Sequence, residues 1–212
     1  MNLRRIAFFE VIHTFLLRYV LYKRRKGYGS IGKGSFVHTP SITGHGQKNI
    51  FLGDDVNIDW GNVMYCDAAK FIMKDRSGAA IGLTVVTGNH VAQSQSVKDR
   101  NNINGDLQGK EIVVEEEVWL AANVTLLAGA HIGRGAIIGA GSVVRNCSIP
   151  PYAIAIGNPV KVIGFKWTVD EMLAHENAFY PEDQRIDKEL LEKNYKKYFL
   201  DRYKEIKQFV RV

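Results

Sequence analysis

The chain has 212 residues, of which 46% are hydrophobic and 24% are charged. This is the composition of a globular protein and excludes a disordered chain. The length allows one main domain with a small appendage. Cys66 and Cys147 are the only cysteines, too few for a disulfide framework and without the CxxC spacing of a metal site. They indicate a reducing compartment and therefore predict a cytoplasmic protein.

The net charge of +6 belongs to the first 27 residues, which hold seven basic side chains and only Glu10 as an acid. The rest of the chain is neutral and has no nucleic-acid recognition motif, so no nucleic-acid partner is expected. Apolar residues recur at loose helical spacing from Ile6 to Tyr22, but charges interrupt them, which argues against a membrane span and a signal peptide. We expect a basic amphipathic helix over residues 1–29. It packs on the protein or on a sister subunit in the interpretation we favour; contact of residues 1–27 with the inner face of the membrane is the alternative.

A period of six residues dominates the middle of the chain. Bulky aliphatic residues recur at every sixth position, and a small or β-branched residue follows four positions later. The aliphatic positions are Val114, Leu120, Leu126, Ile132, Ile138 and Val144, and the small ones are Val118, Val124, Ala130, Ala136 and Ser142. Neither a helix, with a period of 3.6 residues, nor a long strand, with a period of 2, explains a period of six residues. Short strands joined by corners do, because they stack into the triangular coils of a parallel β-helix.

The weaker repeat before residue 85 extends this prediction to residues 30–165. An ordinary antiparallel β domain is the alternative fold. Residues 91–111 break the period completely, so we expect them to leave the stack as a functional loop. Residues 166–212 are expected to form a helical appendage, with one helix starting near Thr168 and a second, charged helix from Lys188 to about Val210.

The segments that carry a family resemblance are 118–144, Ile149-Pro150-Pro151 and 157–163. They resemble the hexapeptide-repeat acyltransferases, above all the galactoside and maltose acetyltransferases and the capsule or lipopolysaccharide O-acetyltransferases. The resemblance implies an all-β solenoid, a left-handed parallel β-helix with an extruded loop and flanking helices. It also implies a homotrimer with active sites between subunits, acetyl-CoA as acyl donor, no metal, and a saccharide acceptor in surface polysaccharide biosynthesis.

In this family a histidine follows a Thr-Gly pair just before the extruded loop. Here the segment reads Thr87-Gly88-Asn89-His90, with Asn89 as one additional residue. The chemistry supports the assignment, because a sugar hydroxyl is a poor nucleophile at neutral pH and a neutral imidazole can accept its proton. We therefore expect His90 to be the general base.

The remaining site residues follow from matching positions in the resemblance. The cofactor-binding candidates are Trp119, Ala122, Gly139, Ala140, Arg145 and Lys161; the substrate-binding candidates are Asp59, Asp67 and Asn89. Lys161 is the expected phosphate ligand. Arg145-Asn146 stands where relatives tend to carry Thr-Lys, and Arg145 would take the place of that lysine. Trp119 is equally well explained as a packed coil residue, and Trp60 and Tyr65 either stack on a sugar or pack in the core or the trimer.

Three other functions compete with this one. N-acetylation of an amino sugar or another amine would use the same scaffold. A γ-type carbonic anhydrase would need three histidines on zinc, whereas only His90 and His131 lie near the core region of the β-helix, 41 residues apart and without a third partner. A non-catalytic binding solenoid is the third alternative.

Overall fold

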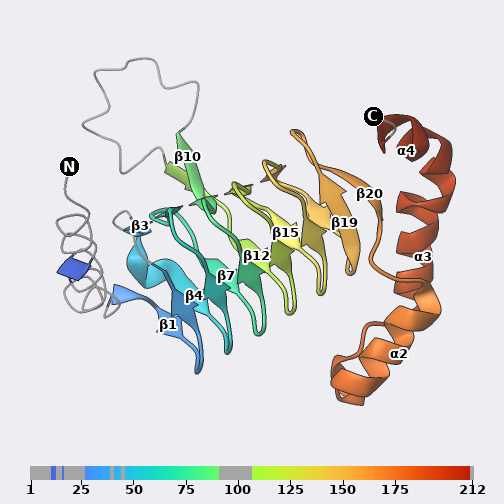
Figure 1. Cartoon of the computed structure of the whole chain (residues 1–212), viewed down its shortest axis with the longest axis horizontal. Coiled ribbons are helices and arrows are strands. Elements are labelled where there is room, and N and C mark those ends of the chain that lie inside the picture. The colour runs from blue at the N-terminus through green and yellow to red at the C-terminus, as the bar shows by residue number, and fades with distance from the viewer. Residues whose placement is uncertain are drawn as a thin grey trace.

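The computed structural model describes residues 11–12, 16, 27–38, 41–43, 46–90 and 107–210. In this part of the chain, short strands stack into a triangular solenoid with helices at its C-terminal end (Figure 1). The expected N-terminal helix lies largely outside the described residues. No helix among the described residues is long and apolar enough to cross a membrane.

Three sheets, here named A, B and C, form the sides of the solenoid, and their strands pair in parallel except for the antiparallel pair of β19 and β20. Sheet A contains β1 (Ser30–Ile31), β4 (Ile50–Leu52), β7 (Phe71–Met73), β12 (Ile112–Val114), β15 (His131–Ile132) and β18 (Ser148–Ile149). Sheet B contains β2 (Phe36–Val37), β5 (Asn57–Ile58), β8 (Gly78–Ala79), β13 (Trp119–Leu120), β16 (Ile137–Ile138), β19 (Ala153–Ile156) and β20 (Lys161–Phe165). Sheet C contains β3 (Ser41–Thr43), β6 (Asn62–Tyr65), β9 (Thr84–Val86), β14 (Thr125–Leu127) and β17 (Val143–Arg145). A short 3-10 helix, η3 (Gln47–Asn49), precedes β4.

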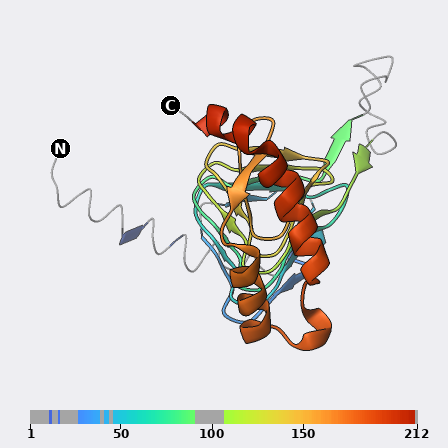
Figure 2. The same cartoon turned by 90° about the vertical axis from the view of Figure 1, so that its right-hand side faces the viewer.

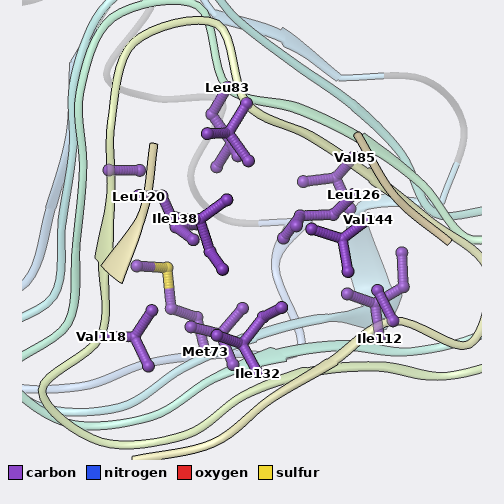
Figure 3. Close-up of a cluster of buried hydrophobic side chains, with 14 of the residues drawn as sticks. Met73, Leu83, Val85, Ile112, Val118, Leu120, Leu126, Ile132, Ile138 and Val144 are labelled. Atoms are coloured by element: carbon purple, nitrogen blue, oxygen red, sulfur yellow. The ribbon is translucent and has the colours of Figure 1, made fainter. Parts of the chain in front are cut away.

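The six-residue period produces the core, as predicted. Every aliphatic residue of the period is fully buried, and so are the small residues four positions later. Figure 3 shows these side chains pointing into the triangle from all three sides. Each coil repeats the one before, so Leu120 pairs with Ile138 and Leu126 with Val144 in adjacent parallel strands. The predicted parallel solenoid is thus confirmed, and it is consistent with the left-handed β-helix.

The solenoid has three corners, which we name after the sheets they join: A–B, B–C and C–A. Figure 2 looks along the stack and shows the corners superimposed from coil to coil. At the B–C corner, Asn123 (φ 58°) and Gly141 (φ 70°) adopt the left-handed backbone conformation that lets the chain turn. Glycine adopts this conformation without steric cost, and asparagine tolerates it better than most residues.

An arm of two antiparallel strands leaves the solenoid at the C–A corner. It consists of β10 (Gly88–His90) and β11 (Leu107–Gly109), in which Gly88 pairs with Gly109 and His90 with Leu107. The sequence predicted an extruded loop over residues 91–111, so the excursion is larger than expected. It includes His90 itself, and residues 107–109 are a strand because they return along β10. Residues 91–106 lie outside the described part of the chain.

The C-terminal appendage contains α2 (Val169–Phe179), η5 (Glu182–Gln184), α3 (Lys188–Tyr198), η6 (Leu200–Arg202) and α4 (Tyr203–Val210). Thr168 begins α2 through a capping box with Glu171, as the sequence suggested. The prediction of one continuous helix from Lys188 to Val210 was wrong. The backbone leaves the helical region at Phe199 (φ −124°, ψ −63°), so that α4 starts anew and contacts β20.

Candidate functional site

The predicted site residues separate into two groups at different corners of the solenoid. Asp59, Ala122, Gly139 and Ala140 lie in turns of the B–C corner, with Trp119 and Lys161 on strands of sheet B next to it. Asp67, Asn89, His90 and Arg145 lie on strands and turns around the C–A corner. Sheet C separates the two groups within one chain. The structure therefore brings Asp67 to the foot of the arm that carries His90, but it does not bring Asp59 there.

At the B–C corner, small residues of successive coils lie directly above one another. The backbone N–H of Ala80 donates to Leu120 O (2.8 Å), and the N–H of Gly139 donates to Ala155 O (2.8 Å). A methyl group on Gly139 would stand 2.6 Å from Ile156 Cγ2, so any larger residue here would require the Ile156 side chain to shift. At Gly141 an added Cβ would meet no atom within 4 Å. The corner is thus an open strip of small residues on which an extended ligand could lie along the solenoid axis.

Lys161 lies at the upper end of this strip. It pairs with Ile156 across β19 and β20, and its Nζ is 5.5 Å from the centre of the Phe209 ring on α4. Arg202 and, to a smaller extent, Lys161 lower the pKa of the Glu205 carboxyl. Lys161, the expected phosphate ligand, is exposed. The Phe209 ring and the Glu205 carboxylate of the appendage lie beside it.

Trp119 lies flat against the outside of sheet B. A Cβ on Gly78, its partner in the coil below, would stand 2.9 Å from Trp119 Cζ3, and the indole is still 48% exposed. Packing on Gly78 therefore explains one face of the ring, while the other face is free within the described part of the chain. Trp60, in the B–C corner near Asp59, is exposed as well.

At the C–A corner, the arm is fixed to the solenoid by Thr87, the residue before β10. Its N–H donates to Tyr65 O (3.0 Å), and its carbonyl accepts from the N–H of Lys110 (3.0 Å). Its buried hydroxyl oxygen accepts from the N–H of Ala69 (3.2 Å). These bonds position the backbone of His90 three residues further on. The side chains of Asn89 and His90 lie outside what the structure describes.

Asp67 begins the turn that lies beneath the arm. The turn runs over residues 67–69, directly after β6, and the Asp67 side chain is exposed. Cys66, the preceding residue, is fully buried, and burial raises the pKa of its thiol to about 12, with the Asp67 charge adding to the effect. A thiol of that pKa stays protonated at neutral pH, so Cys66 is not a nucleophile of this site.

Arg145 lies two strands above Val86 on sheet C and is exposed. The next residue, Asn146, accepts a hydrogen bond from Lys110 Nζ (3.0 Å). Because Lys110 follows β11 directly, this bond ties the returning strand of the arm to the turn after β17. Sequence reasoning missed this contact, since nothing in the repeat indicates that residue 110 reaches a turn two strands away.

Two other histidines of the described chain pair with glutamates away from the arm, and His38 packs against the ring of Phe36. His131 is on the outer face of sheet A, where its Nε2 is 2.9 Å from Glu115 Oε1. His175 on α2 is 3.1 Å from Glu117 Oε2 through its Nε2. Among the described residues, no three His, Cys, Asp or Glu side chains cluster in a way that could hold a metal ion.

A pocket of about 360 Å³ lies on the outer face of sheet A, under α3. His131, Ser148, Pro150, Leu190 and Tyr198 are among its lining residues. None of the predicted site residues lines this pocket. This pocket and the predicted site residues are thus on different faces of the chain.

Residues 111–146 match the bacterial transferase hexapeptide family, described as six repeats. The matched segment begins at the base of the arm and covers the most regular coils. Together with the parallel solenoid, this match shows that residues 111–146 carry the hexapeptide repeat.

Among curated proteins, the chain is similar to the galactoside O-acetyltransferase of Lactococcus lactis subsp. lactis (strain IL1403), with 30% identity over 138 residues. The alignment covers 65% of this chain and 63% of that relative, less than two thirds of its length. The resemblance seen in the sequence, to the hexapeptide-repeat acetyltransferases, is confirmed.

Two solved structures show the same fold at a similar level of identity. One is a hexapeptide-repeat acetyltransferase of Vibrio cholerae O1 biovar eltor in complex with acetyl-CoA, with a TM-score of 0.60 and 28% identity over 71% of this chain and 77% of that chain. The other is a maltose O-acetyltransferase of Clostridium difficile 630, with a TM-score of 0.59 and 28% identity over 68% of this chain and 73% of that chain.

Proposed function

We propose that the chain is an acetyl-CoA-dependent O-acetyltransferase that acts on a hydroxyl group of a saccharide. The observation that supports the proposal is the arm, which carries the backbone of His90 out from the solenoid and has its foot on the turn of Asp67. The similarity to galactoside and maltose O-acetyltransferases supports both the reaction and the class of acceptor. A role in surface polysaccharide biosynthesis, in the cytoplasm, belongs to the same proposal.

In the proposed mechanism, His90 accepts the proton of the acceptor hydroxyl while its oxygen attacks the acetyl carbonyl carbon of acetyl-CoA. The tetrahedral intermediate collapses, the C–S bond breaks, and the protonated imidazole gives its proton to the leaving thiolate. Both substrates are bound together, so the acetyl group passes directly to the acceptor. The products are the acetyl ester and free coenzyme A, and His90 returns to its neutral form.

The strip of small residues at the B–C corner suits the donor. Coenzyme A needs a flat, extended surface for pantetheine, and Ala122, Gly139 and Ala140 offer one along the stack. Lys161 at its upper end would bind phosphate, and Trp119 would flank the pantetheine. Arg145 is the second cationic candidate, at the other corner.

Assembly explains how two corners on opposite sides of sheet C could form one site. The outer face of sheet C carries half-buried apolar side chains, with Val86 and Leu127 next to the exposed ring of Tyr65 and with Val63 and Val143 on either side of Thr84 and Thr125. Such a face favours contact with another subunit. In a cyclic homotrimer, the C–A corner of one subunit would meet the B–C corner of the next, so that Asp67, Asn89 and His90 would face Asp59 and the donor strip of a neighbour.

The test is a transfer assay that detects free thiol release from acetyl-CoA in the presence of a panel of mono- and oligosaccharides. We expect release that depends on a saccharide without an amine, and an acetyl ester as the product by mass spectrometry. Release that occurs only with amino sugars or other amines would instead support the N-acetyltransferase. Binding of acetyl-CoA or saccharide without any turnover would support a non-catalytic solenoid.

A further inference from the structure

The foot of the arm is packed against the turn that begins with Asp67. Gly109, the last residue of β11, lies so close that a Cβ there would stand 2.4 Å from Ala68 O and 2.5 Å from Ala68 C. Both are backbone atoms, which cannot move aside as the end of a flexible side chain would. The returning strand therefore rests directly on the main chain of the turn.

A second contact joins the outgoing strand to the same turn. The hydroxyl oxygen of Thr87 accepts the hydrogen bond from the N–H of Ala69 at 3.2 Å, and the Thr87 side chain is fully buried. Both strands of the arm are thus held at the turn of residues 67–69. A hydrogen bond holds the outgoing strand, and close packing holds the returning strand.

The solenoid itself does not require this hydroxyl. Val86 pairs with Tyr65 in the coil before and with Leu127 in the coil after, so Cys66 and Ala128 occupy the position of Thr87 in the neighbouring coils. Neither residue carries a hydroxyl, and both coils keep the same parallel register. Among these three coils, only the coil that the arm leaves has a hydroxyl at this position.

From these contacts we propose that Thr87 is a positioning residue, which holds the arm on the Asp67 turn and so fixes the location of His90 relative to the bound acceptor. Gly109 serves the same purpose from the returning strand. This inference rests on the proposed function for the roles of His90 and Asp67. The docking of the arm rests on the contacts alone.

The physical consequence concerns one substrate more than the other. The Asp67 turn and the arm belong to the acceptor side of the proposed site, whereas the donor strip lies at another corner. A displaced arm should therefore impair use of the acceptor and the proton transfer, while acetyl-CoA still binds. Misplacement of a catalytic group by about 1 Å can cost on the order of 100-fold in rate. Loss of one anchoring bond should therefore lower the transfer rate measurably.

The test compares Thr87→Val, which has nearly the same shape without the hydroxyl, with Thr87→Ser, which keeps it. Ser148→Ala is the control for loss of a hydroxyl, because Ser148 is exposed on the outer face of sheet A, outside the proposed subunit contact. Gly109→Ala challenges the second contact. The first measurement is amide hydrogen exchange of residues 88–90 and 107–109 in the full-length protein, which needs no substrate.

We expect faster exchange in the arm of Thr87→Val and Gly109→Ala, and wild-type exchange in Thr87→Ser and Ser148→Ala. In the transfer assay, Thr87→Val should lose about tenfold in kcat/KM for the acceptor, with KM for acetyl-CoA changed by less than about twofold. Unchanged exchange and kinetics in Thr87→Val would overturn the proposal. So would an equal loss for both substrates, since that would indicate a merely structural role. A wild-type protein that transfers nothing would refute the proposed function, while the exchange measurement would still decide whether Thr87 anchors the arm.

Discussion

Arg134 and Glu176 form an ion pair of 2.8 Å between the A–B corner of the solenoid and α2, and only 1% of the Glu176 side chain is exposed. The same carboxylate accepts hydrogen bonds from the N–H of Ile186 (3.0 Å) and from the hydroxyl of Tyr152. The guanidinium of Arg134 lies 3.7 Å from the centre of the Tyr180 ring. A buried, fully paired carboxylate thus joins the appendage to the solenoid.

Replacing Glu176 by alanine should destabilise the protein by about 1–3 kcal/mol, because the Tyr152 hydroxyl and the Ile186 N–H would lose a buried acceptor. Arg134 would keep its pair with Glu116. Thermal unfolding should show the loss, and hydrogen exchange should locate it in α2. Glu192→Ala is the control, since Glu192 is 54% exposed and pairs with Lys188 at 3.6 Å on the surface. Equal stability of the two variants would contradict the anchoring role of Glu176.

His90→Ala should lower acetyl transfer at least ~100-fold, the usual scale for loss of a general base, and should leave the fold and oligomeric state unchanged. His131→Ala is the control, because His131 lies on the outer face of sheet A and contacts Glu115 there. Steady-state kinetics with sedimentation analysis measure both properties. A His90→Ala protein that transfers at nearly the wild-type rate would remove His90 from the mechanism.

Lys161→Glu should raise KM for acetyl-CoA roughly tenfold and leave KM for the acceptor nearly unchanged, since it places a negative charge at the phosphate end of the strip. Lys188→Glu makes the same charge change on α3. If Lys161→Glu impairs both substrates alike, the substitution has damaged the packing of β20 against α4 rather than a phosphate contact.

Acid stability should depend on Glu115. The hydrogen bond to His131, followed by the contacts with Lys74, lowers the pKa of this carboxyl to about 2 from its ordinary 4.5. Because the folded-state pKa is depressed, the stabilisation is complete above pH 4.5 and disappears as the pH falls toward 2. Unfolding midpoints measured across this range should fall more steeply for wild type than for Glu115→Gln, and parallel curves would show that Glu115 contributes nothing.

Deletion of residues 1–27 tests the role of the basic segment. We expect the deletion to destabilise the oligomer and the full-length protein to ignore anionic vesicles at low and high salt, because packing on a sister subunit is the favoured interpretation. Salt-sensitive co-sedimentation with vesicles, lost on deletion, would instead establish membrane contact, to which each basic residue can contribute about 1 kcal/mol.

The six-residue period determined the core by itself, because each aliphatic side chain from Val114 to Val144 has only one face of a coil on which it can be buried. The capping box at Thr168 was equally local, since its two hydrogen bonds join residues three positions apart. Such features depend on neighbours in sequence or on a strict repeat, and the sequence contains both.

Contacts between coils and across the appendage were decided only by the tertiary structure. The meeting of Thr87 with Ala69, of Lys110 with Asn146 and of Arg134 with Glu176 joins residues 18, 36 and 42 positions apart. Although these separations are multiples of six, the repeat does not predict the contacts, because each pair joins a regular coil to an irregular segment. The separation of the candidate site residues onto two corners has the same origin. The candidates come from the sequence, and the winding of the chain around sheet C determined which of them lie side by side.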